Sequence, residues 1–298
     1  MKQNSLKLVV PVLVMGVVYF GISRVLGTQT VYMLPALLLL PFIAGPIAVY
    51  FSVRTPNRPF LEAVPKEDET LAPDYRETMA TLTAALAQLG FDPSGAEYIR
   101  SSEAQKRGKG CMSILQNPIT SDIATIMGFP GGASLGFTRY RVDGSRIRTS
   151  FSTQRSCFPP KPADDVLRLD GSYDPEWLWM LHCRRVSHDE SCARNPIISD
   201  AFSYQVHEEF ESINTFISSG YWVDMPDRKH LRMTLRGAVT SSFRSLTPSA
   251  QIFEAMNRRK LQTVLNTIQF PSHEDYRQSA SLKPTSAKEF KRSLVWSR

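Results

Sequence analysis

The sequence predicts an α+β fold, in which a mixed domain with an antiparallel β-meander packed against amphipathic helices follows an N-terminal two-helix transmembrane hairpin. Three observations lead to this prediction. Two long apolar runs occupy residues 1–53, patterns of period two follow between residues 96 and 151, and helical patterns dominate the remainder. Because strands and helices are segregated along the chain, an alternating α/β fold is not expected.

The transmembrane hairpin is predicted from length and hydropathy. Residues 8–26 and 31–53 are almost entirely apolar, and a polar connection, residues 27–30, joins them. A helix over the first run rises about 28 Å, close to the hydrocarbon thickness of a bilayer. A cleaved signal peptide and a pair of soluble core helices are the alternatives. No small-x-small cleavage site follows the first run, and neither run has a polar face.

The charges that flank the hairpin predict its orientation. Lys2 and Lys7 precede it, Arg54, Arg58 and Lys66 follow it, and only Arg24 lies near the connection. Positively charged flanks stay in the cytoplasm. We therefore expect an integral protein of a bacterial inner membrane with both termini in the cytoplasm.

A linker and a first helix follow the hairpin. Residues 54–73 contain four prolines and are expected to form a Pro-rich linker. The soluble α+β domain is expected over residues 74–270. Asp74 caps its first helix in a capping box with Glu77, and Gly90 ends that helix.

Strands are predicted where apolar and polar residues alternate. The expected strands are 96–101, 110–116, 121–128, 135–142 and 145–151. Asp143-Gly144 separates the last two, and this dipeptide is typical of a two-residue hairpin turn. These strands are expected to form the meander.

Helices dominate the rest of the chain. Residues 152–173 are expected to be a connection, and a helix then runs from the cap Asp174 to about Val186. Further elements are a helix from about Ser199 to Gly220, a short strand over residues 231–235 and a helix over 247–268. Residues 271–298 are polar and basic, and we expect a mobile tail.

Charge and cysteine content narrow the functional classes. The formal net charge is +7, which favours anionic surroundings such as lipid headgroups, phosphates or nucleic acid. Nucleic-acid binding by the sheet would need exposed aromatic residues among the basic ones, and these are lacking. Cys111, Cys157, Cys183 and Cys192 show no CxxC spacing and are interpreted as reduced thiols of a cytoplasmic domain.

The predicted hairpin places four arginines on one side of the sheet. A two-residue turn pairs Arg141 with Arg146 and Arg139 with Arg148. Like charges that face each other across strands destabilise a sheet by up to about 1 kcal/mol per pair. Screening or neighbouring acids would offset this repulsion. The functional alternative is an anionic ligand, bound by the planar donor forks of the four arginines.

Gly132-Ala133-Ser134-Leu135-Gly136 matches the G-x-S-x-G nucleophile elbow of hydrolases. The elbow requires a turn from a strand into a helix, which exposes the serine beside oxyanion-hole amides. A strand, residues 135–142, is expected to follow here. A glycine-rich strand connection is therefore the preferred interpretation, and catalysis by Ser134 is the alternative.

His182, Cys183, His188 and Cys192 lie within eleven residues and are all possible zinc ligands. Their spacing fits no common structural zinc pattern, so we interpret Cys183 as a packed residue and His188 as a cation at a helix end. Phosphate-binding loops and the HExxH motif are also missing from the sequence. We expect no metal and no cofactor.

These patterns favour a membrane-anchored cytoplasmic binding or scaffold domain over an enzyme. Its expected partners are the lipid bilayer, and beyond it anionic lipid headgroups or another protein. The alternative is a membrane-bound hydrolase or metal-dependent enzyme that uses Ser134 or the region of His182 and His188. The two hypotheses differ in whether Ser134 reaches a histidine that also contacts a carboxylate.

Overall fold

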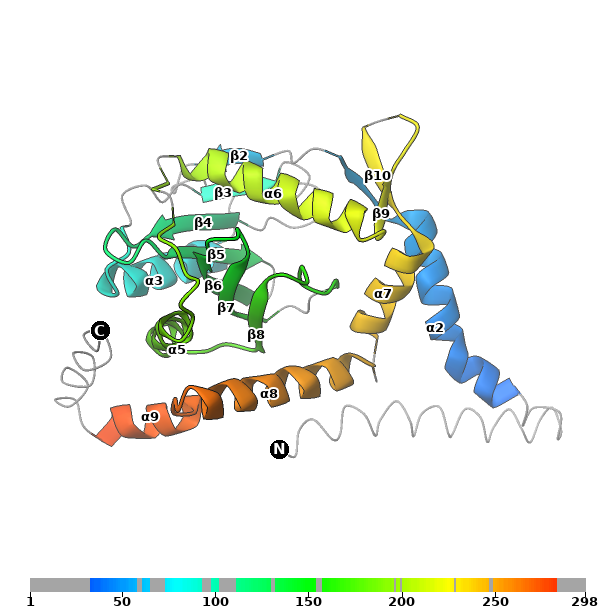
Figure 1. Cartoon of the computed structure of the whole chain (residues 1–298). Coiled ribbons are helices and arrows are strands. Elements are labelled where there is room, and N and C mark those ends of the chain that lie inside the picture. Colours follow the sequence, from blue (N-terminus) through cyan, green and yellow to red (C-terminus); the bar gives the residue numbers. More distant parts are fainter. Residues whose placement is uncertain are drawn as a thin grey trace.

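The computed structural model contains a large sheet, a small sheet and seven helices in the part of the chain that it describes (Figure 1). The described residues are 33–57, 61–64, 73–92, 98–101, 111–129, 132–153, 157–195, 197–198, 200–227, 229–246 and 249–282. Strands and helices are segregated along the chain, so the predicted α+β class is confirmed.

The large sheet has seven strands in sequence order. They are β2 (Leu61–Val64), β3 (Tyr98–Ser101), β4 (Cys111–Gln116), β5 (Ile123–Phe129), β6 (Gly132–Tyr140), β7 (Arg146–Ser152) and β8 (Asp165–Asp170). All neighbours are antiparallel except β7 and β8, which run parallel. The predicted meander is thus confirmed over five strands. The sheet also gains β2 from the predicted linker and β8 from the predicted connection.

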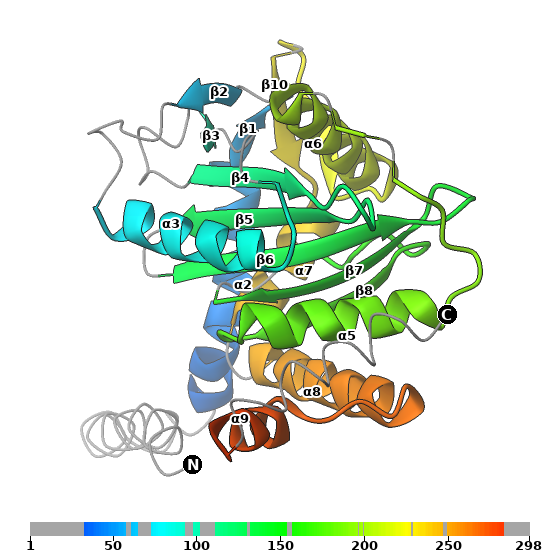
Figure 2. The same ribbon diagram turned by 90° about the vertical axis from the view of Figure 1, so that its left-hand side faces the viewer.

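Two helices cover one face of this sheet, as Figure 2 shows. They are α3 (Pro73–Gln88) and α5 (Pro175–Ser187), and both were predicted. Asp174 caps α5 as expected, because its side chain accepts hydrogen bonds from the backbone N–H groups of Glu176 and Trp177 at 2.9 and 3.1 Å. Trp177 and Phe137 are fully buried between these helices and the sheet, which places the main core on this face.

The other face is bordered by three helices. α6 (Ala201–Ser218) crosses the sheet, whereas α7 (Leu235–Ser245) and α8 (Ser249–Thr267) lie beyond β8 (Figure 1). A small sheet of β1 (Arg54–Pro56), β10 (His230–Met233) and β9 (Trp222–Asp224) lies next to them. α6, α8 and the strand β10 were predicted; α7 and the short strands β1 and β9 were not.

The segment after residue 270 is more ordered than predicted. It contains α9 (His273–Leu282) where a mobile tail was expected. The indole N–H of Trp177 donates to the carbonyl of Pro271 at 3.2 Å, and its ring packs on His273 with centroids 5.1 Å apart. Aromatic packing therefore holds the start of this segment on α5. Residues 283–298 lie outside the described residues.

The described residues include only part of the predicted transmembrane hairpin. The first predicted span, residues 8–26, lies outside the described residues, and the second forms α2 (Met33–Ser52). Among the described helices, none combines the length and the hydropathy that a bilayer crossing requires. The predicted transmembrane hairpin is therefore not found in this part of the chain.

The hairpin between β6 and β7 has a different register from the predicted one. Tyr140 faces Arg146, not Ile147, and Arg139 faces Ile147, not Arg148. The loop has three residues, 142–144, because the N–H of Arg141 donates to the carbonyl of Ser145 at 2.8 Å. Gly144 has a φ of +79°, as the left-handed position of such a three-residue loop requires. This shift by one residue separates the four arginines onto two faces.

Candidate anion-binding pocket

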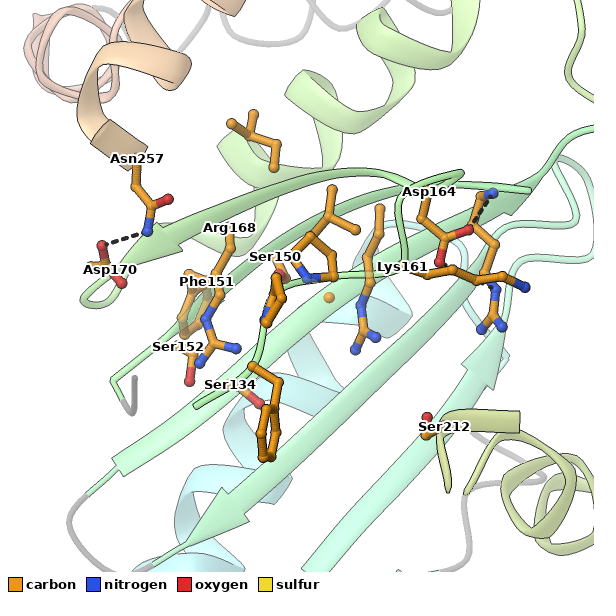
Figure 3. Close-up of a pocket in the computed structure, with 18 of the residues that line it drawn as sticks. Ser134, Ser150, Phe151, Ser152, Lys161, Asp164, Arg168, Asp170, Ser212 and Asn257 are labelled. Atoms are coloured by element: carbon orange, nitrogen blue, oxygen red, sulfur yellow. Dashed lines mark hydrogen bonds and ion pairs between the residues drawn. The ribbon is translucent and has the colours of Figure 1, made fainter. Parts of the chain in front are cut away.

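A pocket of about 520 Å³ opens on the sheet face opposite α3 and α5 (Figure 3). Strands β5 to β8 form its floor, and residues of α6, α7 and α8 form its walls. A segment of the crossover between β7 and β8, residues 158–161, closes one side. Residues between positions 127 and 260 therefore contribute to one concave site.

The floor of the pocket is lined by small residues, which leave the space above the strands open. Ser134 and Gly136 on β6 lie opposite Ser152 and Ser150 on β7. A Cβ atom at Gly136 would lie only 3.1 Å from the Cβ of Ser150 and 3.4 Å from Nε of Arg148. The guanidinium of Arg148 thus lies over Gly136, in space that a larger residue would occupy.

Three arginines from three elements converge in the pocket. They are Arg148 on β7, Arg168 on β8 and Arg244 on α7. Burial lowers the pKa of the Arg168 guanidinium, Asp170 raises it, and the positive charges of Arg148 and Arg244 lower it again. The guanidinium of Arg244 also lies over the ring of Phe253, 4.6 Å from its centroid. The positive charges of Arg148 and Arg244 therefore both act on the guanidinium of Arg168.

Apolar residues also line the pocket. Phe158 packs on Phe216 of α6 with ring centroids 4.9 Å apart, and Phe253 of α8 is a further aromatic lining residue. Pro159 and Pro160 extend this wall. The pocket therefore combines a cationic floor with an apolar wall.

The acids in the pocket are in part already engaged. Arg146 forms an ion pair with Glu208 of α6, and its Nε lies 4.0 Å from Asp164. Glu208 also accepts a hydrogen bond from the hydroxyl of Tyr140 at 2.8 Å. Burial, with the negative charge of Glu208, raises the pKa of Tyr140 to about 12, so Tyr140 remains a donor at neutral pH. These contacts join α6 to the sheet.

The four arginines that were predicted to form one anion-binding site do not lie together. Arg139 lies on the opposite face of the sheet, where Nε and Nη2 each donate to a carboxylate oxygen of Asp122 at 2.7 Å. Arg141 binds Asp189 at 2.7 Å, and Arg146 binds Glu208. Of the four, Arg148 alone is exposed. The predicted like-charge pairs do not form, because the three-residue loop changes which residues face each other.

The core face holds a chain of polar side chains around His182. Its Nε2 lies 3.4 Å from Asp122, and its Nδ1 lies 3.1 Å from the hydroxyl of Thr149. Arg185 donates to Thr149 at 2.5 Å and to Asp165 at 2.6 Å. His182 is fully buried, so this network is closed to substrates and stabilises the core.

His182 should make stability depend on pH. Burial lowers its pKa, Asp122 raises it in part, and Arg185 and Arg139 lower it further, so the folded chain keeps His182 neutral. The unfolded chain takes up a proton on this side chain near pH 6.5, so stability falls as pH drops below that value, by up to about 1.4 kcal/mol per pH unit. Urea unfolding between pH 7 and pH 5 measures this slope. His182→Gln should flatten it, and parallel curves for both proteins would contradict the assignment.

Ser134 and the cysteine–histidine cluster form no catalytic arrangement in the described structure. Ser134 lies within the continuous strand β6 and not on a turn. His182 lies on the other face of the sheet, where its ring contacts the hydroxyl of Thr149. Among the described residues, no three His, Cys, Asp or Glu side chains lie close enough together to hold a metal ion. His182, Cys183, His188 and Cys192 are thus not gathered around one point.

Sequence reasoning missed Arg168 and Arg244. Residues 165–170 alternate between polar and apolar side chains, which is the signal of a strand, but the prolines before them concealed it. Arg244 lies on a helix that the prediction lacked. No protein-family model, curated protein or solved structure gives a significant match to the chain.

Proposed function

We propose that this protein is a membrane-associated binding module, not an enzyme, and that its pocket takes an anionic ligand. The observation that carries the proposal is the convergence of Arg148, Arg168 and Arg244 on a floor of small residues. A phosphate or carboxylate bound there would meet the positive charge of three guanidinium groups, and their planar forks suit its oxygens. The apolar N-terminal runs support the membrane association.

The lining of the pocket narrows the ligand class. The aromatic wall of Phe158, Phe216 and Phe253 stands beside the cationic floor, so a ligand with an anionic group and an apolar part fits better than a bare anion. Such a ligand could be a lipid headgroup with part of its chain or a soluble amphiphilic phosphate. Native mass spectrometry of the purified full chain distinguishes the two by the mass of the bound molecule.

The binding test uses octyl phosphate and inorganic phosphate as probes in isothermal titration calorimetry. Octyl phosphate should bind more tightly than inorganic phosphate, because its chain buries apolar surface. Arg168→Gln and Arg148→Gln should each weaken octyl phosphate binding by roughly 10- to 100-fold, the effect of losing a hydrogen bond to a charged group. Binding should also weaken as salt rises.

The matched control is Arg194→Gln, which removes the same charge from an exposed position outside the pocket lining. It should leave the affinity for octyl phosphate within twofold of the original. Arg148 is exposed, so its replacement leaves the core unchanged and separates lost binding from lost folding. Equal affinities in all three variants would show that the pocket does not hold the probe.

A further inference from the structure

One row of residues crosses the floor of the pocket in register. Arg168 of β8 faces Ser150 of β7, and Ser150 faces Gly136 of β6. All three residues line the pocket, so they lie on the open face of the sheet. Figure 3 shows Ser150 beside Arg168 on this face. Ser150 therefore has an arginine on one side and, on the other, a strand position without a side chain.

The guanidinium of Arg148 lies in the space that Gly136 leaves open. Arg148 precedes Ser150 by two residues on β7, so both side chains point to the same face of the sheet. A Cβ atom at Gly136 would lie 3.1 Å from the Cβ of Ser150, 3.4 Å from Nε of Arg148 and 3.6 Å from its Nη2. The head of Arg148 thus extends over β6, whereas Arg168 belongs to β8. An arginine therefore lies on each side of Ser150.

Positive charge exceeds negative charge around this row. The charges of Arg148 on the floor and of Arg244 on α7 both act on the guanidinium of Arg168. The acid that acts on Arg168 is Asp170, the next residue of β8 on the same face. Its Oδ2 also accepts a hydrogen bond from Asn257 of α8 at 3.2 Å. One carboxylate thus stands against three guanidinium groups, and an anion bound here would reduce the excess.

The number and the directions of these donors favour a phosphoryl group over a carboxylate. A carboxylate offers two oxygens in one plane, whereas a phosphate monoester offers three oxygens that point in different directions and a charge of about −1.5 to −2 at pH 7. An anion above Ser150 would meet Arg168 and Arg148 from two sides, Arg244 from the wall and the Ser150 hydroxyl from below. Four donor groups in different directions are more than one planar anion can use.

We propose that the pocket binds a phosphate monoester, with its phosphoryl group above Ser150 and between the guanidinium groups of Arg168 and Arg148. This inference rests on the proposed function, which requires only that the ligand is anionic and has an apolar part. It adds the chemical class of the anionic group. It also assigns a role to Ser150, whose hydroxyl donates a hydrogen bond to a phosphoryl oxygen. Carboxylates and phosphodiesters present fewer free oxygens and less charge, so the site selects against them.

The test compares three probes with the same eight-carbon chain by isothermal titration calorimetry on the full chain. They are octyl phosphate, the carboxylate nonanoate and the diester octyl methyl phosphate. Octyl phosphate should bind at least about tenfold more tightly than either of the others, because it alone has three free oxygens. Ser150→Ala should weaken octyl phosphate binding about tenfold and so reduce this preference. Arg148→Lys keeps the charge but loses the planar fork, so it should reduce the preference as well.

The matched control is Ser218→Ala, which removes a hydroxyl from an exposed position of α6 outside the pocket lining and should leave the preference unchanged. If octyl phosphate and nonanoate bind equally well, the proposed function stands and this inference is wrong. If no probe binds, both are wrong. A preference that survives both Ser150→Ala and Arg148→Lys would overturn the inference too. The mass of a copurified ligand separates a lipid monoester from a soluble one, and a carboxylate or diester there would contradict the inference.

Discussion

Arg139→Met should lower the free energy of unfolding by about 3–5 kcal/mol, because it leaves the carboxylate of Asp122 charged in the core without its cationic partner, with only the 3.4 Å contact to His182 remaining. Arg139 and Asp122 are joined by two hydrogen bonds of 2.7 Å and are both buried. Burial raises the pKa of Asp122, but His182 and the pairing with Arg139 together lower it below its usual value, so this carboxylate is ionised in the fold. Urea unfolding at pH 7 measures the loss.

Two further variants show whether an unpaired charge causes this loss. Arg139→Met combined with Asp122→Leu should recover a large part of the stability, since a pair of well-packed apolar residues often replaces a buried ion pair at little cost. Arg141→Met should cost about 1 kcal/mol or less, because its partner Asp189 is partly exposed. If the double variant is as unstable as the single one, packing and not charge explains the effect.

Trp177→Ala should also destabilise the fold by about 3–5 kcal/mol, the usual cost of removing a large buried aromatic side chain. Trp177 is fully buried, stacks on Tyr173 with centroids 5.5 Å apart, and packs near Phe270 at 6.1 Å. Because this side chain connects α5 to the segment before α9, hydrogen exchange should rise in residues 270–282 more than in the strands.

Trp177→Phe is the matched control for this variant. It keeps most of the apolar volume but loses the hydrogen bond to the carbonyl of Pro271, so its cost should be clearly smaller. Thermal unfolding and hydrogen exchange on both variants separate packing from hydrogen bonding. Unchanged exchange in α9 after Trp177→Ala would mean that this helix is held by other contacts.

Elements with a local signal were predicted well from the sequence. The capping residue Asp174 and the proline after it defined the start of α5, and period-two patterns located β3 to β7 within a few residues. β8 was missed because it pairs in parallel with β7, through a crossover rich in prolines. A crossover and not a tight turn joins β7 to β8, so no turn residues mark β8 as the neighbour of β7.

The pocket was less predictable than the fold. The register of the β6–β7 hairpin depends on whether the Asp143-Gly144 loop has two or three residues, and the dipeptide occurs in both. A shift by one residue was enough to move Arg139 into the core and leave Arg148 in the pocket. Arg168 and Arg244 join Arg148 only through tertiary packing, which no local pattern encodes.

The position of α8 affects how readily the chain can aggregate during its synthesis. β8 is an edge strand of the large sheet, and such edges offer unpaired backbone groups to strands of other chains. α8 lies along this edge: Lys260 donates to the carbonyl of Val166 at 2.7 Å, and Asn257 to Asp170 at 3.2 Å. On the ribosome the sheet is complete before α8 emerges. During that interval the nascent chain presents an uncovered edge strand, to which strands of other chains can add.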